Sequence, residues 1–200
     1  MSTRQLLLER YVEAKDLTRP QLMREIYAAD AVLTFSIATD SISFPDKVAG
    51  IDGITRTLIV DFGAKYNRCK TYYVCDSLLE HTDRITTVPW LVLMHEPARA
   101  RLRIGKGHYE WTFGPEARES MQVTAMHIHV ERMDPVDDAD GLLLRATQAV
   151  LPYPWLPPSV MRSRLATLSQ SDPALAFLAD FRVPIDPPKP GPRLSQPPRP

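Results

Sequence analysis

The stretch 10–35 constrains the fold most, because its residue pattern changes from helical to extended within a few positions. Tyr11 follows Leu8 and Leu7 by three and four residues, so all three side chains lie on one face of a helix. The shared apolar face indicates that this helix packs against a core. The phenol of Tyr11 is therefore expected to point inward.

A second helix and a strand follow within the same stretch. Thr18 and Pro20 supply an N-cap and a first-turn proline for the helix. From residue 31 to 37 β-branched and aromatic residues favour a strand. The inward-facing residues expected on the second helix are Leu22, Met23, Ile26 and Tyr27.

Beyond residue 68 the hydrophobic period changes to two, which predicts a sheet. In the sequence before this sheet, Gly50 opens a helix whose apolar residues Ile51, Ile54, Leu58 and Phe62 have helical spacing. We expect this helix to pack across the sheet. Pro89 predicts a bulge or an edge in the second strand. Three helices before a curled antiparallel sheet predict an α+β fold, a cone closed by the N-terminal helices. The expected strands are 69–80, 85–96, 99–113 and 120–133, with turns at 81–84, 96–98 and 114–119.

The stretch 10–35 can be laid along the beginning of the steroid isomerases without a gap. Tyr-Ala-Ala-Asp-Ala-Val at 27–32 resembles their helix-to-strand junction. The chain thus resembles the nuclear transport factor 2-like superfamily, which includes SnoaL-like polyketide cyclases, steroid delta-isomerases and scytalone dehydratases. The resemblance covers 10–133 in outline. It implies the same cone, a small-molecule ligand and a homodimer formed through the outer face of the sheet.

The resemblance also assigns residue roles, with two departures. Tyr11 matches the isomerase tyrosine that stabilises the enolate oxygen, and Tyr27 matches a tyrosine that can hydrogen-bond to it. Phe35 stands where the isomerase has its aspartate base, and Leu58 replaces a third networked tyrosine. A phenol that polarises a carbonyl can survive these changes, but double-bond isomerisation by the same route should not.

Two other places offer groups for proton transfer. In 107–113 the polar residues His108 and Glu110 alternate with aromatic residues that include Trp111. If the polar set faces the inside of the cone, His108 and Glu110 form an acid/base pair. If the aromatic set faces inside, it forms part of the core or a wall on which a ligand stacks. Periodicity alone leaves both alternatives open. Asp40, in a loop longer than the isomerase pattern, is either a replacement base or a solvated turn residue.

The last predicted strand alternates Met126 and Ile128 with His127 and His129. The apolar set is the natural inward face, which leaves the histidines outward. A His-x-His pair followed by Glu131 suggests a metal site, but the carboxylate comes only two residues after the second histidine and no later histidine exists. We therefore predict no metal and no cofactor. The predicted substrate-binding residues are Phe35, Leu58, Trp111, Met126 and Ile128.

Charge and composition limit the partners. The chain has 24 basic and 24 acidic residues, so there is no electrostatic reason to expect a nucleic acid or an anionic membrane as partner. No apolar run approaches the roughly 20 residues of a membrane span. Cys69 and Cys75 lie on one predicted strand on the order of 20 Å apart, beyond disulfide reach. We expect reduced cysteines and a cytoplasmic protein.

Three regions are predicted: the cone domain at 1–135, a helical extension at 136–183 and a proline-rich, disordered tail at 184–200. Asp137 and Asp138 can cap a helix that reaches about Val150, and Asp172 can cap the last one. Helices are expected at 159–168 and 173–181. Between the helix that reaches about Val150 and the helix at 159–168, residues 152–158 form a stiff segment. Its Tyr153, Trp155 and Leu156 either strap the domain or complete a partner's pocket.

Two functions fit these patterns. The first is an enzyme of lyase, isomerase or cyclase type acting on a small apolar carbonyl or hydroxy compound. In it Tyr11, supported by Tyr27, donates to a developing oxyanion, and His108 with Glu110, or else Asp40, moves the proton. The second is a non-catalytic dimeric module that binds a small molecule or a protein.

Overall fold

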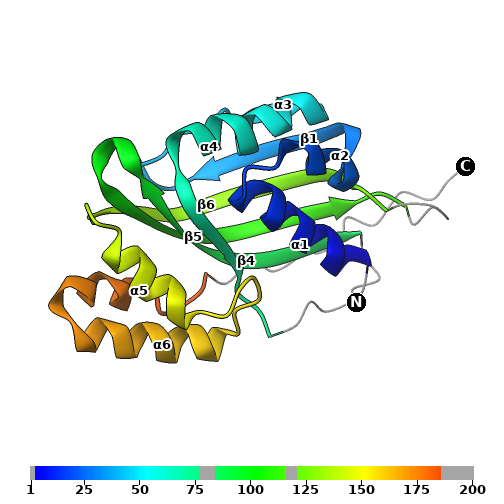
Figure 1. Ribbon diagram of the computed structural model, residues 1–200. Coiled ribbons are helices and arrows are strands. Elements are labelled where there is room, and N and C mark those ends of the chain that lie inside the picture. Colours follow the sequence, from blue (N-terminus) through cyan, green and yellow to red (C-terminus); the bar gives the residue numbers. More distant parts are fainter. Residues whose placement is uncertain (1–2, 77–83, 116–120, 186–200) are drawn as a thin grey trace, which may run out of the picture.

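A computed structural model describes residues 3–76, 84–115 and 121–185 and shows one curved sheet with helices on both faces (Figure 1). The strand order is β2-β1-β6-β5-β4-β3. The predicted α+β class is confirmed. The strands are β1 Tyr27–Ile37, β2 Lys47–Ala49, β3 Asn67–Tyr73, β4 Ile85–Glu96, β5 Arg101–Phe113 and β6 Val123–Asp137. The α-helices are α1 Thr3–Asp16, α2 Met23–Ile26, α3 Ile51–Thr55, α4 Asp61–Lys65, α5 Leu142–Val150 and α6 Pro158–Ser171.

The sheet is mixed rather than wholly antiparallel. Strands β3 to β6 pair antiparallel in sequence order, but β1 pairs parallel with β6, with Phe35 opposite Ile128. A parallel pair needs a long crossover, and the helices and four strands between β1 and β6 supply it. The parallel pairing places the inward residues of β1 and β6 on the same wall of the cone.

The second helix is shorter than predicted. A 3₁₀ turn at Pro20–Leu22 and one turn of α2 replace it, and Tyr27 already belongs to β1, where it pairs with Val123. Thr18 is not the N-cap: its backbone has a positive φ of 52°, and the cap position is Arg19, which makes no side-chain cap bond. Strand pairing at Tyr27 ends the helix earlier than its apolar spacing indicates.

The third predicted helix is one continuous helical segment that includes both α3 and α4. It begins at Ile51, after Gly50 with φ 78°, and continues through a π-helical turn at Arg56–Val60 into α4. Its predicted inward residues Ile54, Leu58 and Phe62 are buried, which confirms their side of the helix. The π turn shifts the inward face by part of a turn between α3 and α4.

Several strand ends differ from the predicted ones. Strand β3 ends at Tyr73, and pairing of β4 with β3 reaches only Trp90, so Pro89 lies where β4 loses that neighbour, as expected for a strand proline. The turn between β4 and β5 is a 3₁₀ turn at Pro97–Arg99. The predicted turns at 81–84 and 114–119 fall largely outside the described residues.

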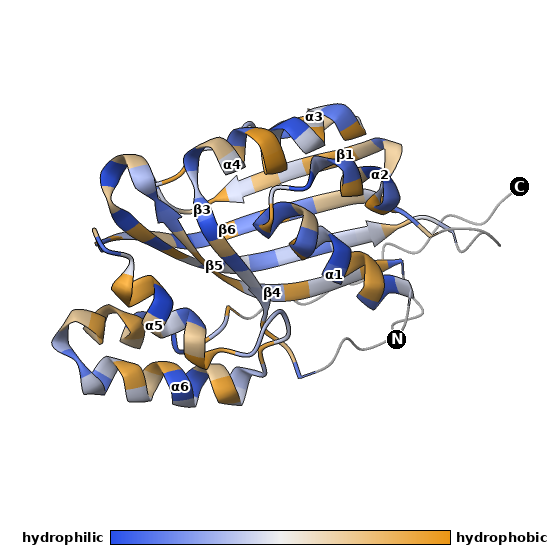
Figure 2. Ribbon diagram, viewed as in Figure 1, coloured by the Kyte–Doolittle hydropathy of each residue, from blue (hydrophilic) through white to orange (hydrophobic). Residues whose placement is uncertain are grey.

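Two hydrophobic cores lie on opposite faces of the sheet. The inner core joins α1, α2, α3 and α4 to the concave face, and the outer core joins β3, β4 and β5 to the C-terminal extension. Figure 2 shows hydrophobic and hydrophilic residues alternating along α6, the pattern of a helix with one buried face. The extension contributes to the outer core Leu144, Leu151, Leu156, Met161, Leu165, Leu175, Leu178 and Phe181.

The predicted caps and strap of the extension are observed. Asp138 accepts hydrogen bonds from the amides of Leu143 and Leu144 at the start of α5, and Asp172 accepts one from Ala174 at the start of a 3₁₀ helix, Pro173–Phe181. Leu156 N donates to the carbonyl of Tyr73, and Tyr73 N donates to that of Pro154, both within 2.9 Å. The segment therefore straps its own domain.

The extension changes what the outer face can offer to a partner. It covers the part of that face formed by β3, β4 and β5. A homodimer through the outer face stays a prediction, and the surface open to it is the part formed by β1 and β6. None of the helices in 3–76, 84–115 and 121–185 combines the length and apolarity needed to span a bilayer. The tail at 186–200 lies outside the described residues.

Candidate functional site

Helix α1 places Tyr11 at the centre of the inner core. Its ring makes edge contacts with the rings of Tyr27, Tyr109 and Trp111, at centroid distances of 6.4, 5.9 and 4.9 Å. The residue is fully buried, and its hydroxyl makes no well-formed hydrogen bond among the described residues. A buried hydroxyl without a partner costs about 1–3 kcal/mol, so its persistence needs an explanation.

A small apolar cavity of about 40 Å³ lies inside the cone against Tyr11. Trp90 also lines it, and its indole N–H has no hydrogen-bond partner in the part of the chain that the structure describes. Two buried donors on the wall of one cavity favour a ligand that carries a hydrogen-bond acceptor. The remaining lining residues are Lys15, Phe35, Ile42, Phe44, Leu58, Phe62, Val92, Met94, Tyr109, Ile128, Val130 and Met133.

One glycine makes room for the indole of Trp90. Gly107 lies opposite Trp90 in the β4–β5 register, and a Cβ atom on it would approach the Trp90 ring to 2.6 Å. The same Cβ would lie 1.9 Å from the backbone oxygen of His129. Only glycine allows this approach, so the tryptophan can lie across β5 and reach the cavity.

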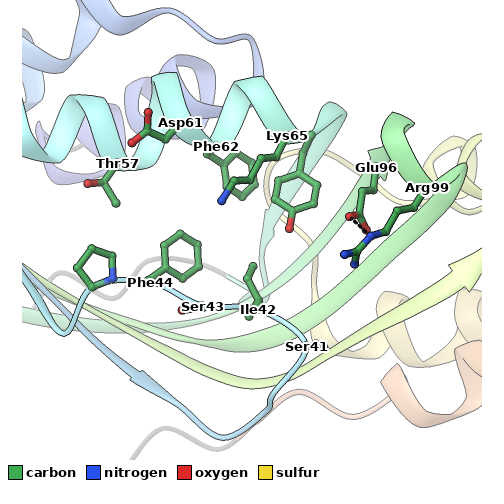
Figure 3. Close-up of a pocket in the computed structure, with 12 residues that line it drawn as sticks. Ser41, Ile42, Ser43, Phe44, Thr57, Asp61, Phe62, Lys65, Glu96 and Arg99 are labelled. Atoms are coloured by element: carbon green, nitrogen blue, oxygen red, sulfur yellow. Dashed lines mark ion pairs between the residues drawn. The ribbon is translucent and has the colours of Figure 1, made fainter.

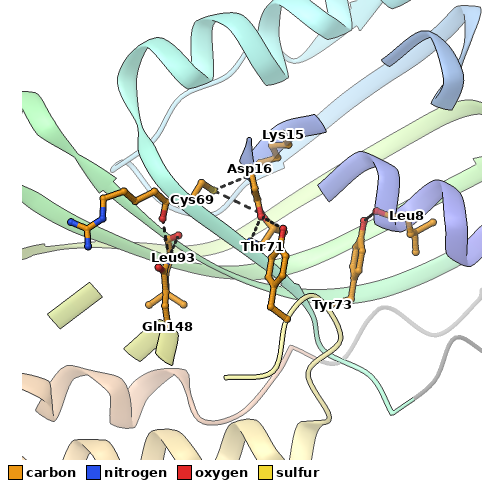
Figure 4. Close-up of polar contacts among 10 residues, drawn as sticks. Leu8, Lys15, Asp16, Cys69, Thr71, Tyr73, Leu93 and Gln148 are labelled. Carbon is orange, nitrogen blue, oxygen red and sulfur yellow. Dashed lines mark hydrogen bonds and ion pairs between the residues drawn. The ribbon is translucent and has the colours of Figure 1, made fainter. Parts of the chain in front are cut away.

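Lys15 brings a positive charge to the same cavity (Figure 4). Its ammonium donates to Thr71 Oγ1 at 2.9 Å, lies 3.3 Å from Asp16 Oδ1 and 3.3 Å from Cys69 Sγ, and sits 4.4 Å from the ring centre of Phe62. Lys15 follows Tyr11 by four residues, so both project from one face of α1. The cavity therefore has a phenol and an ammonium side by side.

Asp16 is held behind Lys15 by several donors. The amide of Thr71 donates to Asp16 Oδ2 at 2.6 Å and its hydroxyl to Oδ1 at 2.8 Å, while the hydroxyl of Tyr153 donates to Oδ2 at 3.1 Å. Buried charges are tolerated when they are paired and fully hydrogen-bonded, which is the case for this carboxylate. The strap at 152–158 therefore helps to fix the ion pair beside the cavity.

Burial sets the protonation states of the site. It raises the pKa of Tyr11 above its ordinary value, an effect that the Lys15 ammonium and the neighbouring Tyr109 side chain only partly oppose. Burial lowers the pKa of Lys15, but Cys69 and Asp16 raise it by more, so the net shift is upward. Burial also raises the pKa of Cys69 to about 12. At neutral pH the site thus contains a neutral phenol, an ammonium and a neutral thiol.

The structure gives Tyr27 a different partner from the one that the resemblance implies. Its hydroxyl donates to the sulfur of Met126 at 2.9 Å, and only its ring touches Tyr11. This reflects the position of Tyr27 at the start of β1, directly beside β6. Tyr27 therefore shapes the packing around Tyr11 and does not donate to its oxygen.

His108 and Glu110 lie on the opposite face of the sheet from Tyr11, which corrects their assignment as an acid/base pair inside the cone. The alternating residues Tyr109, Trp111 and Phe113 are the ones that join the inner core. The ring of His108 stacks on that of His129 at 4.7 Å on the outer face. Burial of three aromatic rings outweighs the burial of a polar pair, and this decides the register that periodicity left open.

The other residues predicted for the site differ in their position relative to the inner cavity. Phe35, Leu58 and Ile128 line the inner cavity. Trp111 and Met126 are buried behind its wall, in contact with Tyr11 and Tyr27 respectively. Asp40 is exposed and lines neither cavity described here, so the structure does not bring it to Tyr11.

The predicted outward position of His127 and His129 is observed. Ser36 Oγ lies 2.8 Å from a ring nitrogen of each histidine, and Glu131 lies 3.1 Å from His129. Burial lowers the pKa of His127 and of His108. Within the described residues, no group of three or more His, Cys, Asp or Glu side chains is arranged to hold a metal ion.

Sequence reasoning missed Lys15, Asp16 and the residues that close the cone. The four-residue spacing from Tyr11 to Lys15 was the available signal, because it predicts an inward lysine. The closing residues Ile42 and Phe44 come from the loop between β1 and β2, whose conformation no periodicity describes. Their contribution depends on tertiary packing alone.

Outside these closing residues lies a larger cavity of about 370 Å³, open at the mouth of the cone (Figure 3). The loop that carries Ile42 and Phe44 forms one side, and α4 with the β4–β5 turn forms the other. The two cavities share Ile42, Phe44 and Phe62 in their linings. These three side chains therefore form the partition between the mouth and the interior.

The comparisons with known proteins identify the fold. No family model matches the chain, and no curated protein sequence does. A nuclear transport factor 2-like superfamily protein from Salmonella enterica superposes with a TM-score of 0.53 at 9% identity, over 65% of this chain and 91% of its own. LinA gives 0.55 at 13% identity, over 67% and 87%. A hexachlorocyclohexane dehydrochlorinase from Novosphingobium barchaimii gives 0.52 at 12% identity, over 67% and 88%.

Proposed function

This chain has the nuclear transport factor 2-like fold, and we propose that it is an enzyme of lyase, isomerase or cyclase type acting on a small apolar carbonyl or hydroxy compound. One observation carries the proposal: Tyr11 lines an apolar cavity, and its buried hydroxyl has no well-formed hydrogen bond within the part of the chain that the structure describes. A carbonyl oxygen bound there would satisfy the hydroxyl. The enzymatic names of the structural neighbours agree with a pocket of this kind but do not define its reaction.

Tyr11 would act as a neutral donor to an oxygen that gains negative charge. Its raised pKa keeps the proton on the phenol, so it donates a hydrogen bond rather than accepting one. The ammonium of Lys15, one helical turn away, adds favourable electrostatics in surroundings from which water is excluded. A preorganised donor of this type contributes about 3–4 kcal/mol to stabilisation of the transition state.

Lys15 is the second group of the cavity that can take part in proton transfer. Because its pKa is raised, it stays protonated at neutral pH and is not available as a base, but its ammonium can stabilise a developing oxygen anion and can protonate an alkoxide, which is more basic than the amine. Phe35 lines the cavity at the position of the isomerase base. We therefore favour reactions whose protonation step occurs at oxygen, such as cyclisation or elimination of a hydroxyl group, over carbon-to-carbon proton transfer.

A non-catalytic binding module is the second candidate, and the size of the interior favours it. The inner cavity holds only about 40 Å³, and Ile42 and Phe44 close it on the mouth side. Tyr11 would then be a packing residue of the core. The two candidates differ in whether a ligand reaches the Tyr11 hydroxyl.

The test uses cyclohexanone labelled with ¹³C at its carbonyl as a probe. Donation from Tyr11 should move the bound carbonyl resonance downfield, and Tyr11→Phe should abolish this shift. Tyr27→Phe is the matched control, because its hydroxyl is occupied by Met126 and the shift should persist. Once an activity is found, Tyr11→Phe should lower kcat by about 10²–10³-fold. An unchanged carbonyl shift in Tyr11→Phe would refute the assignment of the donor.

A further inference from the structure

The cavity at the mouth of the cone has charged walls, unlike the apolar interior. Lys65 and Arg99 line it from α4 and from the end of the 3₁₀ turn before β5, and Figure 3 shows their charged ends directed toward the hollow. Tyr66, which carries a phenol hydroxyl, also lines this cavity. These three groups are hydrogen-bond donors, and two of them carry positive charge.

The acidic residues of the cavity are already paired. Asp61 lies 3.9 Å from the guanidinium of Arg56. Glu96 lies between two arginines, 3.5 Å from Arg99 and 3.6 Å from Arg103. Lys65 has no ion pair among the described residues. The charges that line the mouth are two cations, Lys65 and Arg99, and two carboxylates, but each carboxylate also lies within 3.9 Å of an arginine outside the lining. The ammonium of Lys65 is therefore left to attract an anionic group.

The partition between mouth and interior is fixed by backbone hydrogen bonds of its loop and by stacking of Phe44. The Ser41 carbonyl accepts a hydrogen bond from the buried guanidinium of Arg103, and the Ser41 hydroxyl donates to the carbonyl of Met133. Phe44 stacks on Phe35 with the ring centres 4.6 Å apart and the planes within 3°. An apolar group of similar size could replace Phe44 against Phe35 without exposing polar backbone.

We propose that the mouth binds the carboxylate of an amphiphilic ligand through Lys65 and Arg99, and that the ligand's apolar body displaces Phe44 to enter the cone. The inference rests on the proposed function, because it names the class of compound that reaches Tyr11: a small organic acid with an apolar body. The apolar cavity takes the body, and the donors at the mouth take the anionic group. Binding of a cationic head group would require Asp61 or Glu96 to leave its arginine partners.

Isothermal titration calorimetry with three probes of equal chain length tests the charge preference. Octanoate should bind more tightly than 1-octanol, and octylammonium most weakly. The Lys65→Gln/Arg99→Gln double variant should weaken octanoate binding about tenfold and leave 1-octanol unchanged, because it removes both exposed cations that contact the carboxylate. Raising the salt concentration should weaken octanoate binding to the native protein.

Arg56→Gln is the matched control. It removes a cation from the same helical segment, but Arg56 does not line the mouth, so octanoate should bind this variant far better than it binds the double variant. Both double-variant positions are exposed, and the variant should fold normally. Equal affinity of the double variant and the native protein for octanoate would overturn the inference.

The two proposals fail in different ways. If octanoate and 1-octanol bind alike while the labelled ketone still reports donation from Tyr11, the mouth site is wrong and the interior site stands. If octanoate binding depends on Lys65 and Arg99 but the ketone signal ignores Tyr11→Phe, the mouth is an anion site and the oxyanion donor is wrong.

Discussion

The two faces of the sheet are both buried, but they are buried by different kinds of side chain. The inner face packs phenols and indoles around Tyr11, and three of these groups, Tyr11, Trp90 and Trp111, have a donor without a partner among the described residues. The outer face beneath the extension is packed mostly by aliphatic side chains, and its two fully buried aromatic residues are Tyr72 and Phe181; only the Tyr72 hydroxyl of this core lacks a partner among the described residues. The inner core thus leaves three buried donors unpaired within the described residues, whereas the outer core leaves one and buries mainly aliphatic surface.

This difference suggests a division of labour between the two cores. Buried donors without partners lower stability, so they persist most readily where a ligand uses them. Aliphatic packing contributes stability through apolar area removed from water and leaves no polar group to satisfy. We infer that the extension stabilises the sheet, and that the inner core can therefore retain unsatisfied groups.

The largest expected effect comes from the outer core. Phe181 is fully buried there, beneath the ammonium of Lys106 and the guanidinium of Arg132. Phe181→Ala should lower the free energy of unfolding by about 3–5 kcal/mol, because it leaves a cavity under the extension. Denaturant unfolding would measure this loss. Affinity of the folded variant for the labelled ketone should not change.

Leu142→Ala is the control for that experiment. Leu142 lies in the same extension but is 56% exposed, so its truncation should cost less than about 0.5 kcal/mol. Loss of ketone binding in folded Phe181→Ala would break the separation of the two faces, since it would couple the outer core to the interior.

The sequence predicted the outer architecture better than the site. Apolar spacing and caps fixed the extension, and Asp138 and Asp172 cap their helices as expected. In contrast, the face to which His108 points depends on a one-residue register that alternation cannot determine. The ion pair of Lys15 and Asp16 depends on Thr71, 55 residues further along the chain from Asp16, and no local pattern encodes such a contact.

An intermediate effect is expected from the part of the outer face that the extension leaves open. Burial and neighbouring histidines lower the pKa of His108, which faces His127, His129 and Glu131. Burial also lowers the pKa of His127, although Glu110 opposes the shift. Below the ordinary histidine value of about 6.5 the unfolded chain binds more protons than the folded chain. Stability should therefore be fully present above pH 6.5 and should fall as the pH drops further.

Chemical denaturation at a series of pH values would measure this slope, and His108→Gln should make it shallower. A slope that also steepens with protein concentration would indicate a homodimer that buries the histidines on the part of the outer face formed by β1 and β6. A pH-independent free energy of unfolding between pH 5 and 7 would contradict the assigned direction of both shifts.

The smallest expected effect on stability is that of Tyr11→Phe, although its effect on function is the largest proposed here. The substitution removes a buried hydroxyl without a partner and preserves the ring that contacts Tyr27, Tyr109 and Trp111. The free energy of unfolding should therefore stay the same or rise by up to about 1 kcal/mol, since a desolvation penalty disappears. Tyr73→Phe provides the contrast, because that phenol donates to the carbonyl of Leu8 at 2.9 Å, and its loss should lower stability by about 1 kcal/mol. If Tyr11→Phe proved as destabilising as Tyr73→Phe, the Tyr11 hydroxyl would have a partner in the folded protein without ligand. The inner face would then keep no phenol donor at Tyr11 for a ligand, and its difference from the outer face would be smaller.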